Sequence, residues 1–430
     1  MHRWRVRPLA PLALALASVA CAEARTDTAS DAGPSPDRPT ALDVVAVDTN
    51  PLDSAALDSG AIDAVAVDTS AVDAAIDVPP SDAPSVTVLR VHYPVGARAL
   101  SLRGSLAGLS WERGVAFTRV DANTYEWRSA SVAMPFEWKP LLDDADWSRG
   151  PNYTARPGDT VDVYPRFATA IGRWSRAIPA FSSAVLGNAR GVWVYLPPSY
   201  DENPLRRFPV LYMHDGQNLF DPAAAFGGVT WRVHDAMNLG AEDGSIREAI
   251  VVGPENTAAR IDEYTPTVDA EHMAGGRGDL YLRMLVEELK PLIDRTYRTL
   301  PDRANTALMG SSLGGLISVY AGVTRAETFG AIGAMSPSTW WDDRMILGRV
   351  PALATLSPRP ERVYVDSGDS GASSDDVANT RELAAALRTA GYRDGSTLRY
   401  VVEAGGQHSE RYWAARLPDA LRFLRGPRAE

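Results

Sequence analysis

A serine between two glycines offers the clearest chemistry in this chain. Gly310, Ser312 and Gly314 fit the pattern G-x-S-x-G, after a β-prone stretch at 305–309 and before a helix-forming stretch at 316–321. In this setting the pattern predicts a sharp strand-to-helix turn that exposes the serine hydroxyl as a nucleophile. The alternative is an ordinary turn of small residues. A serine hydroxyl is a weak nucleophile, so the prediction requires a base and an acid farther along the chain.

The base is predicted to be His408. It is the one histidine of six that follows Ser312, as the order serine, acid, histidine of an α/β-hydrolase requires. The loop at 403–408 comes directly after a strand-like stretch at 398–402, and the ends of strands are where α/β sheets carry their chemistry. The competing interpretation of one histidine on a loop is a solvent-exposed residue without a role.

The acid is predicted to be Asp369, just past a strand at 362–365. A carboxylate at this place would fix the histidine tautomer and stabilise the imidazolium. Three other aspartates compete for this role. Asp366 falls close to the strand itself, and Asp375 and Asp376 resemble the first residues of a helix, where acidic side chains favour the macrodipole. The choice among the four remains open at this point.

The first 21 residues predict a secretory signal. Three arginines precede an apolar run at 9–20, which is too short to span a membrane, and no other segment is long and apolar enough to do so. The single cysteine, Cys21, follows this run and resembles the lipid-bearing residue of a bacterial lipoprotein. Ser18 stands where such signals usually carry leucine, so cleavage after Ala24 is the alternative. The chain is therefore expected to be exported, with any membrane contact made through an N-terminal lipid anchor.

Residues 22–84 predict a disordered, acidic linker. Aspartate recurs every five residues from Asp43 to Asp73, a period of neither a helix nor a strand. Residues 22–85 hold 13 acidic and 2 basic side chains, so their net charge equals the −11 of the whole chain. A segment of this kind repels itself and extends. Calcium binding is the weaker interpretation, because the glycine and spacing of calcium loops are missing. The remainder is neutral, which argues against a nucleic-acid partner.

Residues 85–167 predict a small β-sandwich, because short alternating stretches are separated by turn residues. Stretches such as 102–105, 109–111 and 138–142 resemble the immunoglobulin-type modules related to starch- and glycogen-binding domains. The resemblance implies that tryptophans could stack on sugars. Aromatic residues in a small sandwich are more often core, and we expect this for most of them. The four tryptophans concerned are Trp111, Trp127, Trp138 and Trp147.

Residues 168–430 predict an α/β domain with a doubly wound, mostly parallel sheet, because strands and helices alternate. One apolar face marks a helix around 282–289, which Pro291 should bend or restart. With the serine after the fifth strand and the histidine after the eighth, the order is that of an α/β-hydrolase. The expected strands are 183–186, 192–196, 210–213, 249–252, 306–309, 331–335, 363–365 and 399–402.

Residues 180–425 resemble the putative esterase family, which includes feruloyl esterases, enterobactin-type siderophore esterases and mycolyltransferases. The resemblance implies an oxyanion hole formed by the backbone N–H groups of Gln217 and Leu313. His214 and Asp215 are interpreted as a strand-end turn rather than as groups that transfer protons. The segments that carry the resemblance are 212–221, 256–264, the turn at Ser312, 336–341 and the loop at His408.

Three functions follow from these observations. The first is an exported serine esterase acting on a small-molecule or glycan ester, such as an esterified polysaccharide or a siderophore. The second is an acyltransferase on the same fold, and the third is an inert surface protein that binds carbohydrate. The sequence contains no metal-ligand constellation, phosphate loop or cofactor motif, so no cofactor is expected.

Overall fold

The computed structural model describes residues 85–106 and 108–426, all within one compact unit. The predicted signal segment, Cys21 and the linker at 22–84 lie outside the described residues. None of the helices in the described residues combines the length and apolar character that a membrane span requires.

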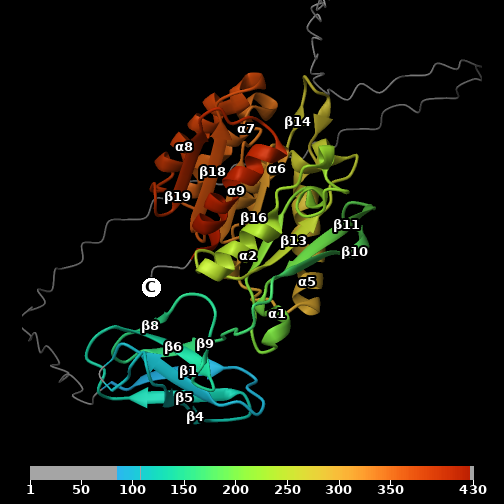
Figure 1. Cartoon of the computed structure of the whole chain (residues 1–430). Coiled ribbons are helices and arrows are strands. Elements are labelled where there is room, and N and C mark those ends of the chain that lie inside the picture. The colour runs from blue at the N-terminus through green and yellow to red at the C-terminus, as the bar shows by residue number, and fades with distance from the viewer. Residues whose placement is uncertain (1–84, 107, 427–430) are drawn as a thin grey trace, which may run out of the picture. The chain divides into compact units, whose positions relative to one another are not determined.

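Residues 87–163 form nine strands in two sheets (Figure 1). One sheet has the order β4-β5-β1-β9, and the other has the order β3-β2-β6-β7 with β8 paired to β6. Leu89 of one sheet and Leu102 and Trp138 of the other belong to one buried hydrophobic cluster, so the two sheets share a core. The likeness to immunoglobulin-type modules remains a prediction. The strands are β1 Thr87–His92, β2 Leu100–Gly104, β3 Val115–Ala116, β4 Thr118–Arg119, β5 Thr124–Ser129, β6 Phe136–Leu142, β7 Asp146–Trp147, β8 Tyr153–Ala155 and β9 Thr160–Val163.

The tryptophans of this module divide into buried and exposed side chains. Trp138 is fully buried, and Trp127 packs half-buried against the same core. Trp147 is 39% exposed, and its ring lies 6.1 Å from that of Trp111. Core positions were expected for most of the four tryptophans, and the structure gives them to Trp138 and Trp127 but not to Trp111 or Trp147.

Residues 173–403 contain an eight-stranded sheet with the order β10-β11-β13-β12-β16-β17-β18-β19. The edge strand β10 pairs antiparallel with β11, and β11 pairs antiparallel with β13. The six strands from β13 to β19 in this order are parallel to one another. This is the mostly parallel sheet that the sequence predicted. The strands are β10 Arg173–Ser183, β11 Asn188–Leu196, β12 Val210–Met213, β13 Ile250–Pro254, β16 Thr306–Ser311, β17 Ala331–Met335, β18 Arg362–Gly368 and β19 Leu398–Glu403.

The first edge strand differs from the sequence expectation. A strand was expected at 183–186, but residue 183 is the last residue of β10 and residues 184–187 form the turn between β10 and β11. The sequence pattern of β10 is obscured because its pairing with β11 shifts register twice and it carries Pro179. Bulges interrupt the period of two, and proline is tolerated only at such edge positions.

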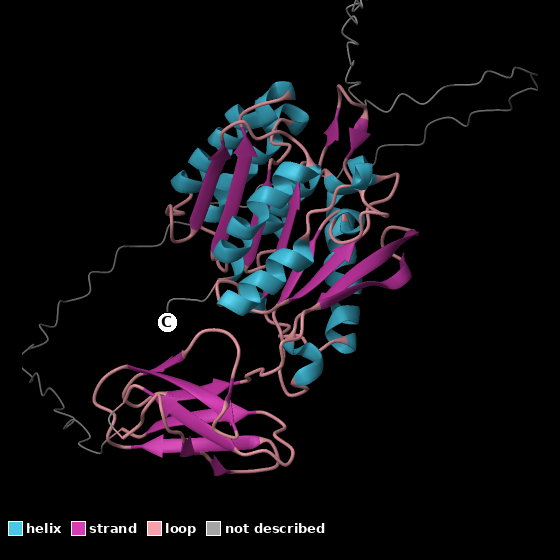
Figure 2. Cartoon of the chain, viewed as in Figure 1, coloured by secondary structure: helices cyan, strands magenta, loops and turns pink. Residues whose placement is uncertain are grey.

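Helices cover both faces of the sheet (Figure 2). On one face, α2 and α9 contribute to a buried cluster with Trp231 and Met309. On the other face, α4 to α8 contribute to a larger cluster with Leu308 and Val365. The α-helices are α1 Ser199–Glu202, α2 Val233–Asp243, α3 Arg260–Tyr264, α4 Gly278–Arg283, α5 Lys290–Thr296, α6 Leu313–Thr324, α7 Trp341–Arg349, α8 Val377–Thr389 and α9 Glu410–Arg425. The remaining elements are η1 Gly216–Asn218, η2 Phe226–Gly228, η3 Met284–Leu289, η4 Arg303–Asn305, η5 Val350–Ala354, η6 Ala372–Asp376 and the hairpin strands β14 Val268–Asp269 and β15 Ala274–Gly275.

The helical stretch from α4 to α5 was expected to bend or restart at Pro291; instead it stays helical and changes its hydrogen bonding just before this residue. The π-helical turn η3 lies directly before α5, and Pro291 is the second residue of α5. Proline has no N–H to donate to the preceding turn, so a change of helical hydrogen bonding at this place is expected.

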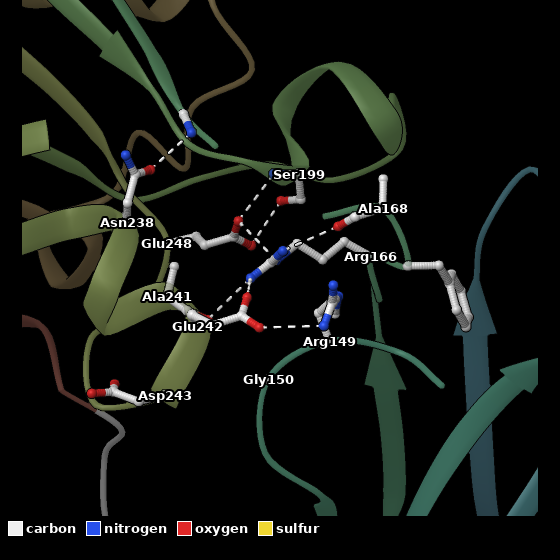
Figure 3. Close-up of polar contacts among 12 residues, drawn as sticks. Arg149, Gly150, Arg166, Ala168, Ser199, Asn238, Ala241, Glu242, Asp243 and Glu248 are labelled. Atoms are coloured by element: carbon white, nitrogen blue, oxygen red, sulfur yellow. Dashed lines mark hydrogen bonds and ion pairs between the residues drawn. The ribbon is translucent and has the colours of Figure 1, made fainter. Parts of the chain in front are cut away.

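Arg166 links the segment after β9 to the domain of the eight-stranded sheet (Figure 3). Its side chain is 5% exposed, and Nη2 lies 2.7 Å from Glu242 Oε2 of α2. Its Nε lies 3.7 Å from Glu248 Oε1, and that carboxylate also accepts from the backbone N–H and hydroxyl of Ser199. A buried cation with two carboxylates therefore sits at this contact.

Arg166→Met is expected to lower the free energy of unfolding by about 2 kcal/mol, since the buried Glu248 loses one of its two cations and keeps only Arg206. The control is Arg173→Met. The ion pair of Arg173 with Asp201 has both side chains more than half exposed, and its loss should cost at most about 1 kcal/mol. Urea unfolding of both variants measures the difference. Equal losses would contradict a stabilising role for Arg166.

Candidate active site

Ser312 occupies the turn between β16 and α6. Its backbone has φ 57° and ψ −127°, and its side chain is half-buried. A positive φ of this kind is strained for a residue with a Cβ and is typical of an exposed nucleophile on a strand-to-helix turn. The structure therefore places Ser312 in the local geometry that the sequence predicted.

Two glycines let a neighbouring loop lie against this turn. A Cβ on Gly310 would stand 2.7 Å from His214 Cδ2, and one on Gly314 would stand 3.2 Å from His214 Cβ. Neither glycine has a positive φ, so close packing rather than backbone freedom requires them. The pattern G-x-S-x-G thus brings the segment after β12 next to Ser312.

His408 lies on the loop between β19 and α9. Its Nδ1 is 2.6 Å from Asp375 Oδ1, and its ring packs edge-on to Trp413 with ring centroids 4.9 Å apart. A carboxylate only accepts hydrogen bonds, so Nδ1 carries the proton and Nε2 is the basic nitrogen. The side chain is 40% exposed and can reach a substrate.

Asp375, and not Asp369, contacts the histidine. Asp369 Oδ1 instead accepts the backbone N–H of Gly405 and so braces the loop that carries His408. The prediction of Asp369 as the histidine's partner was wrong. Asp366 lies inside β18, and Asp376 accepts from an asparagine side chain of α8.

The backbone before α8 explains this difference. β18 continues to Gly368, beyond the predicted strand end. The following turn η6 holds Ser373, Ser374 and Asp375 at φ values of 53°, 49° and 49°. These left-handed residues turn the chain back, so Asp375 is not the ordinary first residue of a helix. Its side chain is fully buried and reaches the histidine.

The environment of Asp375 favours its charged form. Burial alone would raise the pKa of this carboxyl, but hydrogen bonds from His408, Ser336 and the N–H of Gly368 hold it below its ordinary value. A carboxylate that stays ionised can stabilise an imidazolium.

The predicted oxyanion donors follow neighbouring strands. Gln217 lies in η1 after β12, and Leu313 is the first residue of α6 after β16. β12 and β16 are parallel partners, with Met213 opposite Met309, so both N–H groups lie at the same edge of the sheet. The assignment of these two N–H groups to an oxyanion remains a prediction.

His214 and Asp215 are held inside the structure. His214 is 1% exposed, its Nδ1 lies 2.9 Å from the hydroxyl of Tyr281, and burial lowers its pKa to about 3. Asp215 pairs with Arg260 at 2.8 and 2.9 Å. A neutral, enclosed imidazole fits the structural interpretation.

The segment 336–341 contributes residues to which the sequence assigned no role. Ser338 Oγ lies 3.3 Å from Ser312 Oγ, and Ser336 Oγ lies 2.6 Å from Asp375 Oδ2. Trp340 is 40% exposed, and its ring lies 5.3 Å from that of His272 on the β14–β15 hairpin. The only signal in the sequence was the likeness of 336–341 to a family segment.

No group of three or more metal-ligating side chains occurs in the described part of the chain.

Comparison with known proteins identifies the family. A family model described as "Putative esterase" matches residues 183–424, which is more than half of the chain. The uncharacterized protein YbbA of Bacillus subtilis is 28% identical over 253 residues, 56% of this chain and 94% of that protein. The iron(III) salmochelin esterase of Escherichia coli is 27% identical over 255 residues, which cover 56% of each chain. The ferri-bacillibactin esterase of Bacillus subtilis is 26% identical over 39% of this chain and 61% of the relative.

Solved structures of esterases are also similar. A ferulic acid esterase matches 59% of this chain and 98% of its own, with a TM-score of 0.45 and 23% identity. The enterobactin esterase of Shigella flexneri matches 78% of this chain and 92% of its own, with a TM-score of 0.46 and 17% identity. On the match of the family model, the chain belongs to the putative esterase family and, with it, to the esterase class of enzymes.

Proposed function

We propose that this chain is a serine carboxylic-ester hydrolase in which Ser312 is the nucleophile, His408 the base and Asp375 the acid. The observation that carries the proposal is the 2.6 Å contact between His408 Nδ1 and a buried carboxylate that stays ionised. It leaves Nε2 as the proton acceptor, as a Ser-His-Asp triad requires.

The reaction proceeds in two halves. Ser312 Oγ attacks the ester carbonyl while His408 Nε2 takes its proton, and the N–H groups of Gln217 and Leu313 stabilise the oxyanion. The imidazolium, paired with Asp375, then protonates the leaving alcohol, and the acyl group stays on the serine. Water, deprotonated by the same nitrogen, attacks the acyl-enzyme, and the returned proton restores the serine hydroxyl.

Aromatic or siderophore-type esters are the proposed substrates. Curated relatives are named as salmochelin, triacetylfusarinine C and ferri-bacillibactin esterases and as an endo-xylanase/feruloyl esterase. The exposed ring of Trp340 lies two residues beyond Ser338, whose hydroxyl contacts the nucleophile. An exposed indole at this position offers a flat apolar surface to a substrate. Hydrolysis rates test this substrate class. The substrates to compare are p-nitrophenyl acetate, a feruloylated arabinoxylan fragment and a cyclic trilactone catecholate.

Covalent labelling tests the nucleophile. A fluorophosphonate probe should react with Ser312, because this hydroxyl stands on a strained strand-to-helix turn after β16, at the edge of the parallel strands where the His408 loop also leaves β19. Mass spectrometry of tryptic peptides locates the adduct. An adduct elsewhere, or none in protein that hydrolyses p-nitrophenyl acetate, contradicts the assignment.

His408→Ala is expected to lower kcat by about 10³-fold or more, because the base acts in the transition state. The matched control is His92→Ala in the nine-stranded part at residues 87–163, where His92 Nε2 lies 2.7 Å from Asp162 Oδ1 and forms a second His–Asp pair. Its loss should leave kcat unchanged. Steady-state kinetics measure kcat for His408→Ala and His92→Ala. Similar losses of kcat in the two variants would show that His408 is not the base. His214→Ala is a poorer control, since the ring is buried against the glycines of the turn.

Export through the first 21 residues is part of the proposal, with Cys21 as the lipid-bearing residue. The expected result is incorporation of labelled palmitate into the wild type and none into Cys21→Ser. Equal incorporation in both proteins would contradict the anchor.

A further inference from the structure

A buried hydroxyl with three partners lies behind the acid. Ser336 is 1% exposed and follows β17 with a φ of 40°. Its Oγ lies 2.6 Å from Asp375 Oδ2, 2.8 Å from Arg416 Nη2 and 3.0 Å from Trp413 Nε1. The hydroxyl is thus enclosed by one acceptor and two donors.

These partners fix the direction of every hydrogen bond. An indole N–H and a guanidinium N–H can only donate, so Ser336 Oγ must accept from Trp413 and Arg416. Its single proton is then left for Asp375. The hydroxyl therefore has one orientation, in which all of its hydrogen-bonding capacity is used.

The two carboxylate oxygens of Asp375 have different hydrogen-bond partners. Oδ2 accepts from Ser336 and from the backbone N–H of Gly368, and Oδ1 faces His408 Nδ1. Rotation of the carboxylate would break both bonds at Oδ2. The two hydrogen bonds at Oδ2 therefore fix the plane of the carboxylate and the direction of the Oδ1 lone pair that faces the histidine.

Arg416 supplies the charge of this cluster. Its guanidinium is 5% exposed, with Nε 3.0 Å from Asp366 Oδ2, Nη1 2.8 Å from Glu403 Oε2 and Nη2 3.8 Å from Asp375 Oδ2. Burial raises the pKa of Asp366 to about 6, although Arg416 opposes this. The cation is shared among three carboxylates and reaches Asp375 mainly through the serine.

Helix α9 carries both donors. Trp413 and Arg416 are three residues apart and so lie on one face of the helix. The ring of Trp413 also packs against His408, two residues before the start of α9. One helix therefore supports the base directly and the acid through Ser336.

We infer that Ser336 is a positioning residue for the acid: its hydroxyl, oriented by Trp413 and Arg416, holds Asp375 so that Oδ1 faces His408. The inference rests on the proposed Ser312–His408–Asp375 triad. Because the serine acts through Asp375 and does not face the substrate, its loss should lower kcat and leave KM unchanged.

The test is Ser336→Ala. This change removes the hydroxyl but keeps a Cβ, so the backbone strain at the positive φ of this residue is the same in both proteins. We expect kcat to fall by about 10- to 100-fold, the factor that corresponds to one hydrogen bond to a charged group. The acid limb of the kcat/KM profile should move to lower pH, because a carboxylate that is free to rotate no longer keeps Oδ1 facing the imidazolium and stabilises that cation less. Two other acids near His408, Asp376 and Glu410, and the more distant Asp366 are present in the wild type and in Ser336→Ala alike. They therefore do not account for a difference between the two pH profiles.

Ser367→Ala is the matched control. Ser367 is fully buried near the end of β18, and in the part of the chain that the structure describes its hydroxyl has no hydrogen-bond partner. The same chemical change should leave kcat and the pH profile as in the wild type. If Ser336→Ala does not fold, Trp413→Phe decides, since it removes one of the two donors that orient the hydroxyl and should shift the same limb in the same direction.

The outcomes separate this inference from the proposed function. Wild-type kcat and an unmoved acid limb in Ser336→Ala, with Asp375→Asn inactive, overturn the role of Ser336 alone. A fall in kcat with an unmoved acid limb also overturns it, because that result indicates a loss of folded enzyme. Full activity in Ser312→Ala overturns the proposed function and this inference with it.

Discussion

Ser312→Ala is expected to lower kcat by about 10⁴- to 10⁶-fold, the largest effect of any single change in this chain. The variant loses the atom that forms the acyl-enzyme, while the base, the acid and the oxyanion donors remain. The residual rate then comes from water attacking a bound ester. Hydrolysis of p-nitrophenyl acetate under saturating conditions measures it, with active wild-type enzyme as the reference.

The fold should be unchanged in this variant, because alanine keeps the Cβ that the turn already accommodates. Circular dichroism and the melting temperature check this point. A variant that is folded and retains more than about one-tenth of the wild-type kcat would show that another residue is the nucleophile, since single changes to a triad serine cost far more.

Asp375→Asn is expected to lower kcat by about 10³- to 10⁴-fold. An amide can donate where the carboxylate accepts, so the histidine would be held in the wrong tautomer with its proton on Nε2. Asp369→Asn is the control, because Asp369 binds only a backbone N–H near the same loop in the described contacts. Its kcat should remain within about three-fold of the wild type, since the amide oxygen can accept the same bond.

The same substitution is thus expected to abolish most of kcat at Asp375 and to leave kcat almost unchanged at Asp369, six residues earlier. Steady-state kinetics of both variants at pH 8 decide between them. A large loss in Asp369→Asn with little change in Asp375→Asn would return the acid to the position that the sequence favoured and contradict the contact at His408.

Two of the central strands, β12 and β17, could be predicted with the correct bounds. β12 and β17 are buried along their whole length, so Val210–Met213 and Ala331–Met335 read as continuous apolar runs between polar residues. β10 could not be predicted, because it is mostly exposed and its bulges break the alternation. Burial on both faces, rather than strand propensity, made the difference.

The positions of the proposed nucleophile and base after their strands could be predicted, because each depends on a local pattern. The acid could not, because its position depends on the left-handed backbone of Ser373, Ser374 and Asp375, which no local rule for serine or aspartate predicts. The role of Ser336 depends on contacts with α9, about eighty residues farther along the chain. Only the folded structure brings these residues together.

The backbone of Ser312 has a consequence for the evolution of this enzyme. Its φ of 57° and ψ of −127° suit glycine better than any residue with a side chain. Ser312→Gly should therefore be inactive and yet more stable than the wild type by about 1 kcal/mol, the scale of strain at such positions. A lineage released from selection for catalysis would gain stability by losing its nucleophile, so inactive relatives with glycine at this position are an expected product of drift.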